Sequence, residues 1–118
     1  MSLFALAAIG LLSRALSSES SDERESSTNR QIYRTQDGRA DYQFSIERQR
    51  DGTYRPYITD QPSYGLQSTG GHATHRLTDS RGTYVCWSEP LRSQEDAKRV
   101  AARWADATQN YIRTGARF

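Results

Sequence analysis

Residues 42–58 read YQFSIERQRDGTYRPYI, and this stretch decides the fold. Apolar and polar residues alternate on either side of residues 50–52, which is the pattern of two half-buried β-strands joined by a turn. A three-residue loop pairs Phe44 with Ile58 and brings the apolar residues of both strands to one face. A two-residue Asp-Gly loop would divide them between the two faces. We therefore predict an antiparallel hairpin in which Gly52 takes the left-handed conformation that such loops need.

The second of these strands contains Pro56, which cannot donate a hydrogen bond to a neighbouring strand. We therefore expect this strand to lie at an edge of the sheet or to be bulged at the proline. The residues that follow, 60–71, contain three glycines and one proline, which predicts a mobile loop.

A second hairpin is predicted from residues 72–79 and 83–88, which flank a turn at residues 80–82. The same reasoning from alternation gives a three-residue loop that pairs Leu77 with Val85. The side chains expected to face the core are Ala73, His75, Leu77, Val85 and Trp87. Those expected to face outward are Arg76, Thr78, Tyr84 and Cys86.

The C-terminal part of the chain predicts a helix. Ser93 is a good N-cap with Asp96 three residues later, and Gly115 is a normal stop. Residues at three-four spacing form one stripe: Ala97, Val100, Ala101, Trp104, Thr108 and Tyr111. The predicted fold is α+β: an antiparallel meander of four strands, or five with residues 31–36 as an edge strand, packed on one C-terminal helix.

Composition limits the protein class. The chain has 118 residues, of which 35% are hydrophobic, so it has room for one domain and too few apolar residues for an integral membrane protein, a large-cavity enzyme or a coiled coil. A single cysteine excludes an intramolecular disulfide. The net charge of +2 is too small for bulk attraction to nucleic acid, although all but one of the basic residues are arginines.

The N-terminal region divides into two segments, which precede the domain expected at residues 31–118. Residues 1–16 form an apolar arm, expected to be a short helix; its uncharged part, residues 1–13, would span about 20 Å and cannot cross the ~30 Å membrane core. It would dock on a partner, a second copy or a membrane surface, or remain an unattached tail. Its apolar side chains are Leu3, Phe4, Leu6, Ile9, Leu11 and Leu12. Residues 17–30 lack apolar side chains and are expected to be a flexible linker.

No catalytic constellation stands out. His72 and His75 are three residues apart, and on a strand this spacing sends the two rings to opposite faces, which disfavours a shared metal. Cys86 lies out of phase with His75 and is not paired with a base. We therefore expect no enzyme activity, no cofactor, no metal and no small-molecule substrate.

The outward face of the sheet is the surface that the sequence singles out. Arginine and tyrosine interleaved on an exposed sheet are suited to hold phosphates and to stack on bases. The residues placed there are Arg55, Tyr57, Arg76 and Tyr84, with Arg48 and Arg81 at the rim.

The stretch RDGTYR (residues 50–55) and the helix start SQEDA (residues 93–97) resemble small DNA-binding domains built from a three-stranded sheet and a helix. These are the arm-site domains of tyrosine-type integrases and a plant domain of the same shape. The resemblance covers residues 42–112 and implies that the sheet binds in the major groove. This chain has a longer central loop and a less basic sheet than those families.

We therefore expect a non-enzymatic binding module of the cytoplasm, with nucleic acid as the first ligand class. The alternative is a protein–protein interaction module, such as an adaptor, an inhibitor or an assembly component, that uses residues 1–16 or the same sheet face. A second alternative is an exported domain with residues 1–17 as a signal segment. Such segments normally start with a basic residue, whereas the first basic residue of this chain is Arg14.

Overall fold

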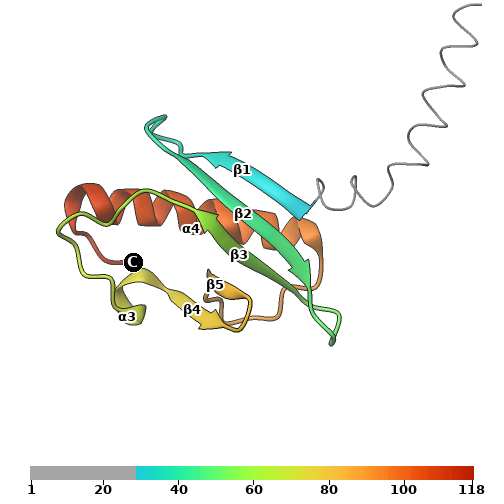
Figure 1. Ribbon diagram of the computed structural model, residues 1–118. Helices are drawn as coiled ribbons and strands as arrows, with labels where there is room; N and C mark the ends of the chain where they lie inside the picture. Colours follow the sequence, from blue (N-terminus) through green and yellow to red (C-terminus); the bar gives the residue numbers. More distant parts are fainter. Residues whose placement is uncertain (1–28) are drawn as a thin grey trace, which may run out of the picture.

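The computed structural model describes residues 29–118 and shows an antiparallel sheet with a long C-terminal helix (Figure 1). The strands are β1 (Arg30–Arg34), β2 (Asp41–Arg48), β3 (Tyr54–Asp60), β4 (Arg76–Asp79) and β5 (Gly82–Val85). The helices are α3 (Gly71–Thr74) and α4 (Gln94–Thr114). The predicted apolar arm, residues 1–16, and residues 17–28 of the predicted linker lie outside the described residues.

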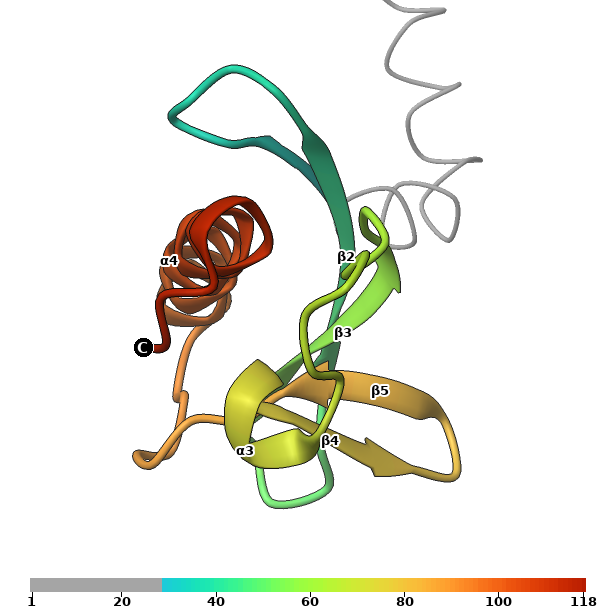
Figure 2. The same cartoon turned by 90° about the vertical axis from the view of Figure 1, so that its left-hand side faces the viewer.

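The sheet has five strands in the order β1-β2-β3-β5-β4, and every neighbouring pair is antiparallel. Helix α4 covers one face of the sheet, as the end-on view in Figure 2 shows. The predicted α+β architecture is therefore confirmed, with residues 30–34 as the additional edge strand.

The first hairpin has the predicted register. Phe44 lies opposite Ile58, and the Gln49 N–H donates to the Thr53 carbonyl at 2.7 Å across the turn. Gly52 has a φ of 86°, as a three-residue loop requires. All three apolar residues of β2 are consequently buried: Tyr42, Phe44 and Ile46.

The expectation that β3 is an edge strand is wrong, because β3 lies between β2 and β5. The register shift in β3 lies opposite Gln43 and Phe44 and not at Pro56. The Tyr54 N–H points away from β2 and donates to the Leu91 carbonyl at 2.7 Å. Pro56 is two residues after Tyr54, so its backbone nitrogen also points away from β2. The missing N–H of Pro56 therefore costs no hydrogen bond between β2 and β3. The pairing of β3 with β5 starts only at Tyr57, beyond the proline.

Helix α4 is confirmed, with Ser93 as its N-cap and Gly115 as its C-cap. The Ser93 hydroxyl accepts the Asp96 N–H at 3.1 Å. Every residue of the predicted stripe is buried. Trp104 is the centre of the core: its ring meets those of Tyr42 and Phe44 edge-on, at 5.8 and 6.0 Å between centroids.

The second hairpin does not have the predicted register. Asp79 lies opposite Gly82, so the turn contains two residues, and Leu77 pairs with Tyr84 instead of Val85. Because side chains alternate along a strand, this slip by one residue exchanges the two faces of β4, whereas Val85 in β5 is buried as predicted. Leu77 and Trp87, expected in the core, are 48% and 42% exposed.

Two local features explain the slip. Residues 71–74 form α3 instead of a strand, and His75 ends that helix in the left-handed region at a φ of 53°, so β4 starts only at residue 76. At the turn, Asp79 Oδ1 accepts the Arg81 and Gly82 N–H groups at 2.8 and 3.2 Å, which favours a two-residue connection. The prediction of an extended strand from residue 72 onward is therefore wrong.

The loop predicted at residues 60–71 contacts α4. Tyr64 is buried against Tyr111, with 6.1 Å between the ring centroids. The Tyr111 hydroxyl donates to the Ser68 carbonyl at 2.9 Å. These contacts hold the loop and α3 at the C-terminal half of α4.

Candidate functional site

The outer face of the sheet carries a tight polar cluster of Arg55, Tyr57, Asp79 and Tyr84. Asp79 Oδ2 accepts hydrogen bonds from Arg55 Nη1 at 2.7 Å and from the Tyr57 hydroxyl at 2.6 Å. The Arg55 guanidinium also lies 4.2 Å from the centre of the Tyr84 ring, and this ring lies 5.6 Å from that of Tyr57. The cluster is therefore satisfied from within the chain.

The electrostatics of this cluster follow from the same contacts. The hydrogen bond from Tyr57, helped by the backbone N–H groups of Arg81 and Gly82 and by Arg55, holds the pKa of Asp79 below its usual value. The Tyr57 side chain itself is only 4% exposed. Arg55 and Tyr57, two of the predicted nucleic-acid-binding residues, thus have their polar groups bound to a carboxylate.

Arg76 does not lie on this face, which corrects its predicted placement. It pairs with Val85, a core residue, and therefore lies on the helix side of the sheet. Its guanidinium is 4.9 Å from the centre of the Tyr64 ring, and Nη1 donates to Gln61 Oε1 at 3.2 Å. The one-residue slip of the second hairpin is the cause.

The two predicted rim arginines lie at the turns of the hairpins. Arg81 forms an ion pair with Glu47 at 2.8 Å. Arg48, Arg50 and Arg81 line an open hollow of about 440 Å³, together with two carboxylates, Asp51 and Asp79. The structure brings these arginines together, although it separates them from Arg76.

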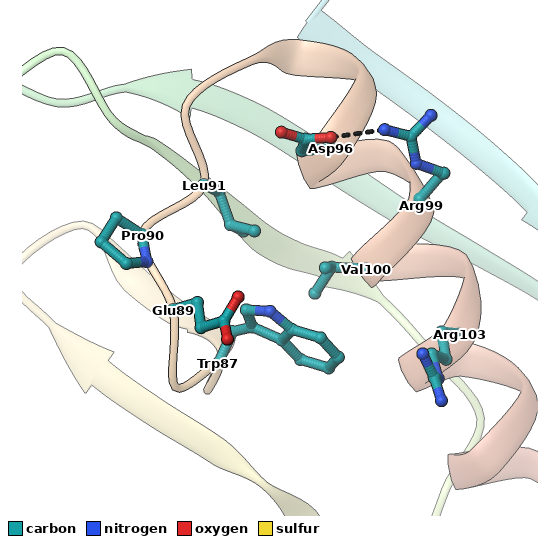
Figure 3. A pocket seen from close by; sticks show the side chains of 8 residues that line it. All are labelled: Trp87, Glu89, Pro90, Leu91, Asp96, Arg99, Val100 and Arg103. Atoms are coloured by element: carbon teal, nitrogen blue, oxygen red, sulfur yellow. Dashed lines mark hydrogen bonds and ion pairs between the residues drawn. The ribbon is translucent and has the colours of Figure 1, made fainter.

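A different surface lies between α4 and residues 86–91. It consists of two adjoining hollows, which we call together the Trp87 groove because both are lined by Trp87 and Arg103. The first, about 340 Å³, is shown in Figure 3 and is also lined by Glu89, Pro90, Leu91, Asp96, Arg99 and Val100. The second, about 520 Å³, is also lined by His75, Cys86, Ser88, Trp104, Ala107 and Phe118.

The groove follows one strip of α4, from Asp96 to Ala107. Eleven residue steps along a helix span about 16 Å. The opposite wall is held in place by the Leu91 carbonyl, which accepts the Tyr54 N–H. Figure 3 shows the side chains of Leu91 and Val100 directed toward each other on the floor of the first hollow.

The groove exposes an aromatic surface beside an unpaired cation. Trp87 is 42% exposed, and Phe118, at the far end of the groove, is 43% exposed. Arg99 is paired with Asp96, whereas the Arg103 side chain has no ion pair or hydrogen bond within residues 29–118. Aromatic and arginine side chains in this arrangement are typical of protein-binding surfaces.

In the part of the chain that the structure describes, no group of three or more His, Cys, Asp or Glu side chains is placed to hold a metal ion. His72 lies in α3, and Cys86 is exposed at the groove, where its N–H donates to the His75 carbonyl at 2.9 Å. Among residues 29–118, no helix has both the length and the apolar character needed to cross a membrane.

Sequence reasoning missed the groove because it placed Trp87 in the core. One signal was present: Pro90 ends any regular strand shortly after Trp87. The strip of α4 that contains Arg99, Arg103 and Ala107 lies next to the buried apolar stripe. Periodicity alone therefore predicts that this strip faces solvent and not a groove.

Comparisons of this chain with protein-family models, with curated proteins and with solved structures found no match. The resemblance to three-stranded DNA-binding domains therefore rests on the two sequence motifs alone, and the sheet has five strands.

Proposed function

We propose that this protein is a protein–protein interaction module that binds an apolar segment of a partner in the Trp87 groove. One observation carries the proposal: a half-exposed tryptophan lies beside an arginine that has no partner in the described residues, in a groove whose second hollow is mostly apolar. Tryptophan and arginine are among the residues that are enriched at the positions that dominate binding energy.

The groove indicates the chemistry of its ligand. Its length of about 16 Å along α4 fits three turns of a helix or about five extended residues. The apolar floor and the Trp87 ring would receive large aliphatic or aromatic side chains, and Arg103 would pair with a carboxylate at the middle of the segment.

The expected contribution of Trp87 follows from its exposure. A tryptophan offers up to about 250 Å², so the 42% that is still exposed amounts to about 100 Å². At ~25 cal/mol per Å², covering it would contribute about 2.5 kcal/mol, or about 60-fold in affinity.

The test is selection of peptides from a random library displayed against the full chain, followed by calorimetric titration of a selected peptide. Trp87→Ala is expected to lower the affinity for the peptide about 60-fold. Arg103→Glu is expected to lower the affinity for peptides that carry a carboxylate. Leu77→Ala is the matched control, since Leu77 is 48% exposed but lies on the outer face. A peptide whose affinity responds to Leu77→Ala and not to Trp87→Ala would refute the proposal.

Nucleic-acid binding is a second candidate, favoured by the three arginines around the hollow at the hairpin turns. Arg48 and Arg50 have no ion pair within the described residues. Binding through phosphates predicts affinity for a labelled DNA duplex that falls steeply with salt and that Arg48→Ala with Arg50→Ala weakens. Fluorescence anisotropy measures both effects. An affinity for DNA that changes neither with salt nor with these substitutions would exclude nucleic-acid binding through this hollow.

A further inference from the structure

We infer that the resident occupant of the Trp87 groove is residues 1–16 of the same molecule, so that the chain covers its own binding site until a partner displaces this segment. This inference rests on the proposed function, because it names the segment that the groove holds in the absence of a partner.

The described chain begins at the N-terminal end of α4, on the opposite side of this helix from the groove. The Asn29 side chain accepts a hydrogen bond from Gln94 Nε2 at 3.1 Å, and Gln94 is the first residue of α4. Asp96 and Arg99, from the next turn of α4, line the first hollow. Asn29 therefore lies at the N-terminal end of α4, where β1 begins (Figure 1).

The connecting chain is long enough. Residues 17–28 are twelve residues, which reach at most about 40 Å when extended and average about 19 Å as a flexible coil. The path from Asn29 to the groove passes around α4, which is about 10–12 Å across, and the strip of α4 in the groove is about 16 Å long, so the linker spans this path. A segment tethered at this distance has an effective concentration in the millimolar range, so even weak affinity fills the groove.

The chemistry of the two segments is complementary. Residues 1–13 carry no charged side chain and include six large apolar residues, which suit the apolar floor of the groove. A helix over these residues is about 20 Å long, close to the length of the strip on α4.

Charge adds to this match. Residues 17–28 carry four carboxylates and one arginine, a net charge of −3. Arg92 lies just before α4, and Arg103 lies in its N-terminal half. Neither side chain forms an ion pair within the described residues. The acidic linker would therefore run beside two free cations as it leads the apolar segment into the groove.

Cys86 provides a direct readout, because it lines the second hollow, is exposed and is the only cysteine of the chain. The rate of its alkylation by iodoacetamide is measured in the full native chain and in the double variant Leu6→Glu, Leu11→Glu. Occupancy of about 90% predicts alkylation about tenfold faster in the variant. The control Leu6→Met, Leu11→Met keeps the segment apolar and is expected to keep the protection.

The outcomes separate the two proposals. Equal rates in the native chain and the Glu variant would overturn the inference, and protection that disappears on hundredfold dilution would overturn it in favour of a second copy. In either case, peptides that bind the Glu variant through Trp87 would leave the proposed function standing. Failure of the Glu variant to bind any selected peptide at Trp87 would refute the proposed function itself.

Discussion

Replacing Trp104 by phenylalanine tests the packing of α4 on the sheet. The Trp104 indole is 3% exposed, and its Nε1–H donates to the Thr74 carbonyl at 2.9 Å. Thr74 is the last residue of α3, so this one hydrogen bond joins α4 to the helix that precedes β4.

The magnitude follows from two losses. A buried carbonyl left without its donor costs about 1–3 kcal/mol. The smaller ring leaves a void beside Tyr42 and Phe44, which adds about 1 kcal/mol. We therefore expect Trp104→Phe to lower the free energy of unfolding by about 2–4 kcal/mol, a large part of the ~5–15 kcal/mol of a typical domain.

Urea denaturation of the full chain followed by far-ultraviolet circular dichroism measures this loss. Trp87→Phe is the matched control, since Trp87 is half-exposed, and should change stability by less than about 0.5 kcal/mol. Proton exchange gives a second readout: the indole N–H of Trp104 should exchange slowly and that of Trp87 quickly. A loss at Trp104 no larger than that at Trp87, or two indole protons that exchange equally fast, would refute the reasoning.

Three other substitutions test separate features. Thr108→Val should raise the unfolding free energy by about 1 kcal/mol in urea denaturation, because the buried Thr108 hydroxyl has no partner within the described residues; a loss of stability would contradict this. Gly52→Ala should cost about 1 kcal/mol because φ is 86°, whereas Gly70→Ala, at a φ of −61°, should cost less; equal costs would contradict the left-handed turn. The hydrogen bond from Tyr33 to Asp106 raises the pKa of Tyr33 to about 12, so its stabilisation is complete below pH 10 and is lost as the pH rises through 12. In the Tyr33→Phe variant, the fall in unfolding free energy between pH 10 and 12 should be smaller. Titration of tyrosinate absorbance should show one fewer tyrosine that ionises near pH 12.

Alternation predicted the first hairpin because its strands are regular from Phe44 to Ile58, short of the register shift, and its apolar residues alternate there without a break. Only one register then buries Phe44 and Ile58 together, and the left-handed Gly52 allows the turn. Helix α4 was equally readable, because its cap at Ser93 and its stripe agree with each other.

The second hairpin was not predictable in the same way. Its apolar residues are few, so the burial of Val85 alone does not choose between registers one residue apart. The choice is made by Asp79, which binds the turn, and by the helix that ends at His75, and these are side-chain and tertiary effects. The slip moved Arg76 to the other face, and β5 ends at Val85, so that Trp87 lies outside the strand that was predicted to place it in the core.

The most direct test of the account is a map of amide chemical-shift changes in the full chain as a library-selected peptide is added. We predict that the largest changes fall on Cys86, Trp87 and Arg103, which line the groove from both sides. Changes that instead concentrate on Tyr57, Tyr84 and their neighbours on the outer sheet face would contradict the account.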